Sequence, residues 1–579
     1  MDSQTSFFEF PDRLHSWRKL VPYAALLGIT LAVYSATVFF QFVWDDVYYI
    51  GLNYRIQELS RDRLWMIWTG THLGHYAPMQ LTFLALVHFF SGIDPLGYHV
   101  AQLLVHAASV CLLFHLLSKM ESPRIAWLAS LLFALYPPNI ETVAWVSETK
   151  STLAFLFFLL SFYMFLRQRE TGKFNYGFWC GLFLLLSLLS KINTVVAPAI
   201  FLLWDYRQGS LTKDRLRSLA VYFLLCVAFV GIHLTSFYEP SESDGTMYYL
   251  GFWTHLMNIP RFLWFYVRML AFPYPLSAWR MVPISESIDW TIVLTWTGLF
   301  GLLGLLYRGN RVVRFWGLWF LVFLAPVLQL FPFGIWVADR YLYIPAIGGF
   351  VLAGMGFFAV RERIPSRAGV WGLNLAMGMV LLLFAWTTFS HVPVWRNNLT
   401  LWETTTPDCD TSAYCHVSLG AALLDDGQTE RGFREMIRGV ELRDAPGFLL
   451  HLGDAYSVVA HDYNQAGVAY SAALAQTPGP GKAAIYAKLV RINVLTGNFT
   501  QARSALEAGM EASTAEPDLW ASKAFLEWKE GNTEETRDSL VQALILAGQP
   551  PDVVAFLHQV WGNARDVQQL LQAVQPATQ

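Results

Sequence analysis

Two adjacent carboxylates, Asp45 and Asp46, follow the first apolar run of the chain and are flanked by aromatic residues. A paired acid near a helix end is often only a cap or a solvated turn. Here Trp44, Tyr48 and Tyr49 surround the pair with aromatic surface of the kind on which sugar rings stack. Apolar surroundings also raise the pKa of a carboxylate towards the range of a useful general base. We therefore interpret the pair as candidate acid–base groups.

Three basic residues, Lys150, Lys191 and Arg340, stand at the ends of apolar segments, on the same predicted side as the acidic pair. Charges at membrane depth are costly and usually have a counter-ion. A lipid phosphate is the natural counter-ion for these cations. Snorkelling towards lipid headgroups explains any single one of them but explains three less well. Arg261 and Arg268, seven residues apart on one helix face, are further candidates for the same phosphate.

Glu141 and Glu148 bracket a short outer loop, where either could orient a cation or a sugar hydroxyl. The predicted sugar or acceptor pocket comprises Trp44, Tyr48, Tyr76, Glu141, Glu148 and Tyr341. His72, His75 and Asp94 could suggest a metal, but their spacing fits no ligand motif. We interpret these histidines as ordinary loop residues, so no metal site is predicted, although a divalent metal is left open.

The elements that position these residues are apolar helices. The chain of 579 residues is 55% hydrophobic and 14% charged, whereas a soluble domain carries about 25% charged residues. Apolar stretches of spanning or nearly spanning length occur at about 20–42, 97–119, 124–140, 148–167, 175–190, 193–206, 216–237, 289–307, 313–331, 340–360 and 369–390. They predict about eleven membrane spans. The first apolar segment is not expected to be a cleavable signal peptide. A net charge of −3 with no basic tract gives no indication of nucleic-acid binding.

Basic residues occupy every second loop. They are Arg13, Arg18 and Lys19; Lys119 and Arg124; Arg167, Arg169 and Lys173; Arg207, Lys213, Arg215 and Arg217; Arg308, Arg311 and Arg314; and Arg361, Arg363 and Arg367. The positive-inside rule places these loops and the N-terminus in the cytoplasm, and the region after the last span outside it. The apolar segment 253–272 is interrupted by polar residues and Pro260, so we expect an amphipathic or re-entrant helix there. Segment 77–90 is expected to lie at the interface.

At about residue 396 the long apolar segments end and a more charged sequence of predicted helical repeats begins. Gly497 and Gly531 are 34 residues apart, and Gly427 precedes Gly497 by 70, which is about two tetratricopeptide (TPR) repeat lengths. We predict four repeats that form a solenoid with a concave surface. Such a surface could bind an extended peptide or could serve only as a cap. Cys409 and Cys415 could form a disulfide outside the cytoplasm, or remain two unrelated thiols.

A series of motifs resembles that of the transmembrane-and-TPR-containing O-mannosyltransferases and their bacterial relatives. The motifs are Phe42-Val43-Trp44-Asp45-Asp46, Gly97-Tyr98-His99 with His106, the run from Glu141 to Glu148, Leu189-Ser190-Lys191, and the run from Asp339 to Pro345. The resemblance covers nearly the whole chain. It implies a GT-C glycosyltransferase with a polyprenyl-phosphate sugar donor, an inverting transfer and an acidic base in the first outer loop. By match, Asp45 and Asp46 take the acidic role, and Lys191 and Arg340 the donor side.

We therefore expect an all-α protein with a GT-C-like transmembrane domain over 1–395 and an extracytoplasmic TPR domain over 396–579. It would move a sugar, with mannose as a candidate, from a lipid-linked phosphate to a hydroxyl of an extracytoplasmic protein. The expected partners are the lipid donor, membrane lipids and a protein acceptor on the TPR domain. The expected location is a bacterial inner membrane with the repeats in the periplasm, or alternatively the endoplasmic reticulum membrane. The rival functions are a lipid-linked sugar flippase and an inactive membrane-anchored scaffold.

Overall fold

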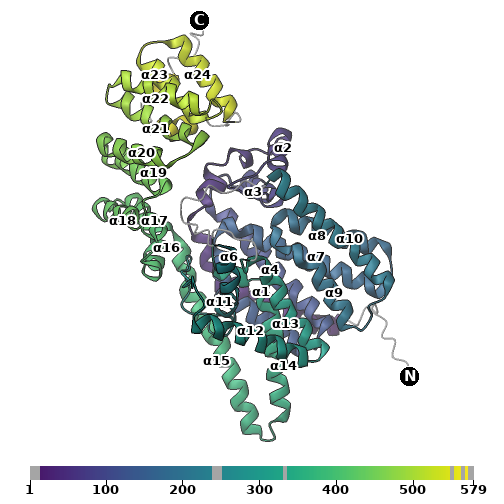
Figure 1. Cartoon of the computed structure of the whole chain (residues 1–579). Helices are drawn as coiled ribbons and strands as arrows, with labels where there is room; N and C mark the ends of the chain where they lie inside the picture. The colour runs from purple at the N-terminus through teal and green to yellow at the C-terminus, as the bar shows by residue number, and fades with distance from the viewer. Residues whose placement is uncertain (1–12, 238–250, 330–334, 548–552, 562–566, 572–579) are drawn as a thin grey trace. The chain divides into compact units, whose positions relative to one another are not determined.

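The computed structural model describes residues 13–237, 251–329, 335–547, 553–561 and 567–571. Regular structure in these ranges is helical, apart from one isolated bridge between His72 and His75. The expected all-α class is therefore confirmed (Figure 1). The chain divides into two compact units at the boundary between Leu401 and Trp402.

The first unit is a bundle of helices. They are α1 (Arg13–Tyr34), α2 (Arg61–Thr69), α3 (Pro78–Ser91), α4 (Pro95–Met120), α5 (Pro123–Leu135), α6 (Asn139–Ala144), α7 (Thr149–Thr171), α8 (Phe174–Ser190), α9 (Ala197–Arg207), α10 (Lys213–Ile232), α11 (Phe252–Ala271), α12 (Trp290–Arg308), α13 (Arg311–Leu324), α14 (Ala346–Arg363) and α15 (Arg367–His391). Each of the eleven predicted apolar segments coincides with helical structure over most of its length. The end of segment 313–331, at residues 330–331, lies outside the described residues.

Six segments of the described chain are long and apolar enough to cross a membrane. They are Leu20–Phe39, Pro95–Met120, Val146–Thr171, Lys213–Thr235, Trp290–Arg308 and Arg367–Arg396. Shorter apolar helices occur at Pro78–Ser91, Pro123–Leu135 and Phe174–Ser190. The count of eleven spans therefore stays a prediction.

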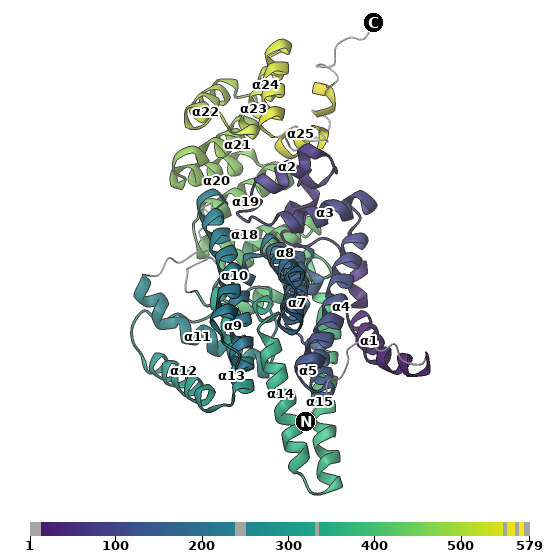
Figure 2. The same cartoon turned by 90° about the vertical axis from the view of Figure 1, so that its right-hand side faces the viewer.

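Helix α7 is the central helix of the first unit. In its apolar window 72% of the residues are buried, against 6% for α12 and for α15. It packs against α8 and α4, as the second view illustrates (Figure 2). Phe165 of α7 stacks on Phe201 of α9 at a ring distance of 4.5 Å. Glu148 is the N-cap of this buried helix, and Lys150 lies in its first turn.

The predicted cytoplasmic loops are joined to one another by ion pairs. Arg169, in the last turn of α7, lies 2.8 Å from the buried carboxylate of Asp205 in α9. Arg207 lies 2.5 Å from Glu121, which follows α4, and Arg314 donates to the Tyr206 hydroxyl at 2.7 Å. The loops therefore gather at one end of the bundle, as alternating crossings require. Which side of a membrane this end faces stays a prediction.

In its described residues, the second unit contains four antiparallel helix pairs. They are α17 (Ala413–Asp425) with α18 (Thr429–Leu442), α19 (Pro446–Ala455) with α20 (Tyr463–Gln476), α21 (Lys482–Leu495) with α22 (Phe499–Ala512), and α23 (Pro517–Lys529) with α24 (Thr533–Leu546), followed by α25 (Val553–Trp561). Gly427, Gly497 and Gly531 occupy the turns within three pairs, with φ of 82°, 77° and 87°. Glycine adopts this left-handed conformation without steric cost. The periodic glycines in the sequence therefore mark the turns of the predicted repeats.

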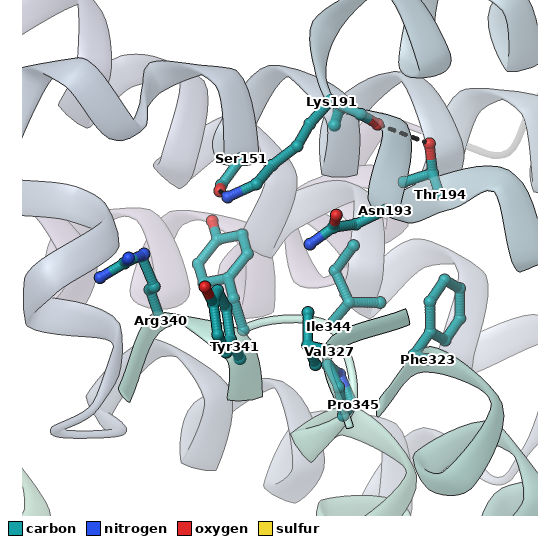
Figure 3. A pocket seen from close by; sticks show the side chains of 12 residues that line it. Ser151, Lys191, Asn193, Thr194, Phe323, Val327, Arg340, Tyr341, Ile344 and Pro345 are labelled. Carbon is teal, nitrogen blue, oxygen red and sulfur yellow. Dashed lines mark hydrogen bonds between the residues drawn. The ribbon is translucent and has the colours of Figure 1, made fainter. Parts of the chain in front are cut away.

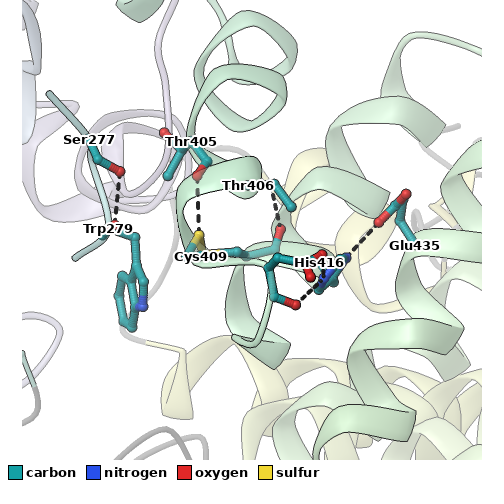
Figure 4. Close-up of a disulfide and its surroundings, with 9 residues drawn as sticks. Ser277, Trp279, Thr405, Thr406, Cys409, His416 and Glu435 are labelled. Carbon is teal, nitrogen blue, oxygen red and sulfur yellow. Dashed lines mark hydrogen bonds and ion pairs between the residues drawn. A yellow bond between two sulfur atoms is a disulfide. The ribbon is translucent and has the colours of Figure 1, made fainter. Parts of the chain in front are cut away.

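A disulfide joins Cys409, which precedes α17, to Cys415 in the first turn of α17, and this resolves the two alternatives left open by the sequence (Figure 4). His416, next to the disulfide, adds two further contacts. Its ring lies 2.6 Å from the Glu435 carboxylate of α18 and 2.9 Å from the Asp410 carbonyl oxygen. The first repeat is thus fastened at its beginning.

Gly420 offers a test of helix packing in the first repeat. A Cβ at this position would lie 2.5 Å from Met436 Cγ and 2.8 Å from the Gly432 carbonyl oxygen. We expect Gly420→Ala to destabilise the second unit by about 1–3 kcal/mol, because overpacking must displace the backbone of α18. Thermal unfolding of the full chain measures this, with Glu441→Ala on the exposed face of α18 as control. Equal midpoints for both variants would contradict the close approach.

Candidate anion-binding and acid–base site

The buried carboxylate of Glu148 holds three cations from different parts of the chain. Its Oε2 lies 2.9 Å from Lys191 Nζ and accepts a hydrogen bond from the Ser151 hydroxyl. Its Oε1 lies 3.7 Å from Lys150 Nζ and 3.5 Å from Arg340 Nε. The Glu148 side chain is only 2% exposed. The structure thus brings together all three cations that the sequence placed on the phosphate side.

Arg340 is fixed from two sides. It lies in the short helix η8 (Asp339–Leu342), and its guanidinium pairs with Glu141, whose Oε2 also accepts the Arg340 backbone N–H at 2.9 Å. Burial raises the pKa of Glu141 to about 7, against the lowering effect of Arg340. The neighbouring Asp339 receives two hydrogen bonds from Arg280, at 2.9 and 2.8 Å. Two ion pairs therefore hold η8 in place.

Beside these cations lies a pocket with an empty volume of about 430 Å³. The side chains that line it are drawn in Figure 3. Ser151, Lys191, Asn193, Arg340 and Tyr341 form a polar end, and Phe323, Val327, Ile344 and Pro345 form an apolar end. The two ends suit an amphiphilic ligand with an anionic head.

Lys191 and Arg340 keep hydrogen-bond donors for such a ligand. A lysine ammonium has three N–H donors, of which two serve Glu148 at 2.9 Å and Ser151 at 2.8 Å. The guanidinium of Arg340 uses Nη1 for Glu141 and Nε for Glu148, and within the described ranges no acceptor engages its Nη2. Burial lowers the pKa of Lys191 to about 8, while Glu148 opposes this shift. The remaining donors can form charge-assisted bonds to an anion.

Asp46 is an internal anchor of the acidic turn. Its carboxylate is fully buried and accepts hydrogen bonds from the Ser147 backbone N–H at 2.7 Å, the Ser147 hydroxyl at 2.5 Å and the Val43 N–H at 3.1 Å. Burial raises the pKa of Asp46 to about 7, although these hydrogen bonds lower it. These three hydrogen bonds lie inside the fold, so the geometry favours a structural role for this member of the pair.

Asp45 lies beside the cations instead. Its side chain is partly exposed. Burial raises its pKa, whereas the nearby charges of Lys150 and Arg340 lower it. A carboxylate that remains reachable and has a raised pKa suits a general base. The two acids therefore differ in burial and in hydrogen-bond partners.

The acidic turn is held in a strained conformation by distant segments. Trp44 has φ of 54°, which is uncommon for a bulky residue. Its backbone N–H donates to Asn398 Oδ1 at 2.7 Å, beyond α15. Its indole stacks on Trp145 at 4.6 Å, and Trp145 stacks on Trp395 at 6.0 Å. The Arg340 guanidinium lies 5.4 Å from the Trp145 ring. The turn, the stack and the cation cluster therefore form one connected structure.

Of the predicted site residues, Lys191, Arg340 and Tyr341 line the pocket, and Tyr48, Tyr76, Arg261 and Arg268 are among those that do not. Arg261 pairs with Asp289 at 3.4 Å, and Arg268 donates to the Tyr274 carbonyl oxygen at 2.9 Å. The Tyr76 hydroxyl donates to the Trp68 carbonyl oxygen at 3.0 Å, and Tyr48 is 46% exposed. The structure thus does not bring the two α11 arginines to the phosphate position, because their helix directs them to its own flanking loops.

Several residues of the site were not anticipated. They are Ser147, Ser151, Arg280, Asn193, Trp145 and Asn398. Ser151 could have been found from its three-residue spacing from Glu148 at a helix start. Ser147, Arg280, Trp145 and Asn398 act through contacts between segments far apart in the chain. In the described part of the chain no group of three or more His, Cys, Asp or Glu side chains could hold a metal ion.

Comparisons with known proteins point to mannosyltransferases. Residues 75–233 match the family model described as dolichyl-phosphate-mannose-protein mannosyltransferase. The chain is 23% identical over 490 residues to protein O-mannosyl-transferase TMTC3 of Homo sapiens, covering 74% of this chain and 52% of that protein. It is 26% identical over 487 residues to TMTC4 of Mus musculus, covering 71% and 64%. The expected resemblance is confirmed.

The matches cover only part of the length of the relatives. The chain spans about half to two-thirds of these two relatives. Identity reaches 30% over 197 residues with protein O-mannosyl-transferase tmtc2 of Xenopus laevis, covering 31% of this chain and 23% of that protein. Among solved structures, the APC/C hetero-tetramer Cut9-Hcn1 is matched at a TM-score of 0.25 and 10% identity, covering 81% of this chain and 88% of that chain.

The different environments of the two acids predict different effects on stability. Asp46→Ala leaves three buried donors without an acceptor, and each unsatisfied group costs about 1–3 kcal/mol. We expect a clear fall in the thermal unfolding midpoint of the full chain. Asp45→Ala, at a partly exposed side chain, should leave that midpoint nearly unchanged. The reverse order of the two variants would contradict the assignment of Asp46 as the anchor.

Proposed function

We propose that the protein is a GT-C membrane glycosyltransferase that moves a sugar, with mannose as first candidate, from a polyprenyl-phosphate donor to a hydroxyl of an extracytoplasmic protein. The observation that carries this proposal is the pocket lined by Lys191 and Arg340. It joins the donors of Lys191 and Arg340 to an apolar wall, as a phosphate on a hydrocarbon chain requires. The names of the relatives, protein O-mannosyl-transferases, support mannose as the sugar and a protein as the acceptor.

The chemistry follows from this arrangement. The acceptor oxygen forms a bond to the anomeric carbon of the sugar, and the bond from that carbon to the phosphate oxygen breaks with inversion. Asp45 takes the proton of the acceptor hydroxyl. The departing polyprenyl phosphate keeps the bonding electron pair, and Lys191 and Arg340 stabilise its charge. Asp45 is thus the base, and the two cations act on the leaving group.

The setting of the reaction follows from the expected topology. Basic loops gathered at the opposite end of the bundle favour a site on the extracytoplasmic side. The disulfide of the second unit suits the same oxidising side. A bacterial inner membrane with the repeats in the periplasm fits both features, with the endoplasmic reticulum as alternative. The solenoid of four helix pairs offers a surface for the protein acceptor.

Substitution of Asp45 tests the base directly. Asp45→Asn keeps the shape of the side chain and removes its basicity, so transfer should fall by about 10²–10⁴-fold. The purified full chain is given a polyprenyl-phosphate mannose and a Ser/Thr-rich peptide, and glycosylated peptide is counted by mass spectrometry. Donor binding and the unfolding midpoint should stay near wild type. Near-normal turnover in Asp45→Asn would remove Asp45 from the mechanism.

Lys191→Ala and Arg340→Ala separate donor binding from base chemistry. A charge-assisted bond is worth about 1.5–3 kcal/mol, so each variant should weaken donor binding by roughly 10-fold or more. Lys213→Ala, at an exposed lysine of the opposite end, is the matched control. Unchanged donor affinity in both pocket variants would mean that the lipid phosphate binds elsewhere.

The pH dependence of transfer should be bell-shaped. Protonation of Asp45 as the pH falls removes the base, and burial raises its pKa, so the acid limb should lie above the usual range of an exposed aspartate. Lys191 must be charged to bind phosphate, and its pKa is lowered to about 8, so activity should also fall above that pH. Lys191→Arg should move the alkaline limb upwards. An alkaline limb unchanged in Lys191→Arg would contradict this assignment.

A further inference from the structure

The pocket has a lining residue whose side chain the mechanism above does not use. Asn193 lies in the short helix η5 (Ile192–Val196), two residues after Lys191, and lines the pocket. Its neighbour Thr194 is occupied, because its hydroxyl donates to the Lys191 carbonyl oxygen at 3.2 Å and accepts from Ser187 at 2.9 Å. The Asn193 carboxamide is partly exposed, and within the described chain no other residue hydrogen-bonds to it.

Asn193 stands at the junction between the two ends of the pocket. In Figure 3 its carboxamide lies between the polar side chains of Lys191 and Arg340 and the apolar side chains of Val327 and Ile344. In a lipid phosphate, this junction corresponds to the ester oxygen where the hydrocarbon chain leaves the head group. A polar side chain at that place is surrounded by few other polar partners, so a ligand is its natural partner.

We propose that Asn193 is a further donor-binding residue whose Nδ2 donates a hydrogen bond to the phosphate from the side on which the prenyl chain leaves. The inference rests on the proposed function. A carboxamide supplies this donor without adding charge to a site that already holds Lys150, Lys191 and Arg340. Asn193 would thereby select a phosphate esterified to a chain over a free phosphate, because both its own position and the apolar wall fix the orientation of the ester.

Binding of farnesyl phosphate to the purified full chain, measured by calorimetry, tests the proposal. We expect Asn193→Ala to weaken binding by about 10-fold or more, and Asn193→Asp to weaken it further, because a carboxylate has no donor and repels the phosphate. The unfolding midpoints should match wild type. Asn175→Asp, at an exposed position at the other end of α8, is the control for the added charge. If Asn193→Ala proves unstable, Asn193→Ser replaces it.

Two outcomes would overturn the proposal. Wild-type affinity in Asn193→Ala would show that the carboxamide does not contact the ligand. Tighter binding in Asn193→Asp than in Asn193→Ala would show that this position accepts rather than donates a hydrogen bond. Inorganic phosphate is the parallel probe. We expect it to bind far more weakly than farnesyl phosphate. Equal affinity for the two probes would contradict the claim that the site selects a lipid phosphate.

The same measurement separates this inference from the proposed function. If Lys191→Ala and Arg340→Ala weaken farnesyl phosphate binding but Asn193→Ala does not, only the role of Asn193 fails. If none of the three variants changes the affinity, the donor site of the proposed function fails as a whole. If all three variants lose affinity for farnesyl phosphate, the result supports both the role of Asn193 and the proposed donor site. Transfer activity is measured separately.

Discussion

The site depends on one buried carboxylate, that of Glu148. An ionised side chain that is 2% exposed is tolerated only when partners compensate its lost hydration. Glu148 therefore draws in Lys150, Lys191 and Arg340 and fixes their positions relative to α7. Lys191 and Arg340 keep donors that Glu148 and Glu141 do not use. These donors lie beside the pocket that we propose for the lipid phosphate.

A second constraint fixes the acid. The turn that carries Asp45 has a left-handed residue at Trp44, and strain of this kind persists only where the surroundings impose it. Here the surroundings are Ser147, which holds Asp46, and Asn398, which holds Trp44. Because Ser147 directly precedes Glu148, the acidic turn and the cation cluster share one anchor. Asp45 and the cations around Glu148 are therefore positioned by adjacent residues of one segment.

Much of this site could be predicted because residue type and position restrict it strongly. A charged residue at the end of an apolar segment needs a counter-ion, which is why Lys150, Lys191 and Arg340 stood out in the sequence. Glycines at repeat spacing marked the turns of the second unit for a similar local reason. The separation of Asp45 from Asp46 could not be predicted, since it arises from a contact with Ser147, 101 residues away. Arg261 was predicted to bind the phosphate, but it pairs with Asp289 of a flanking loop. The sequence does not distinguish a cation that pairs with a nearby loop from one that binds a ligand.

The central claim is that a prenyl-phosphate sugar binds with its phosphate at Lys191 and Arg340 and its sugar towards Asp45. The most direct measurement is a cryo-electron microscopy structure of the full chain with a non-hydrolysable prenyl-phosphate mannose analogue. The account predicts that the phosphate contacts both cations within hydrogen-bond distance, that the prenyl chain lies along Val327 and Ile344, and that the anomeric carbon is the part of the sugar nearest Asp45. A ligand bound elsewhere, or one with its sugar at the apolar end of the pocket, would contradict it.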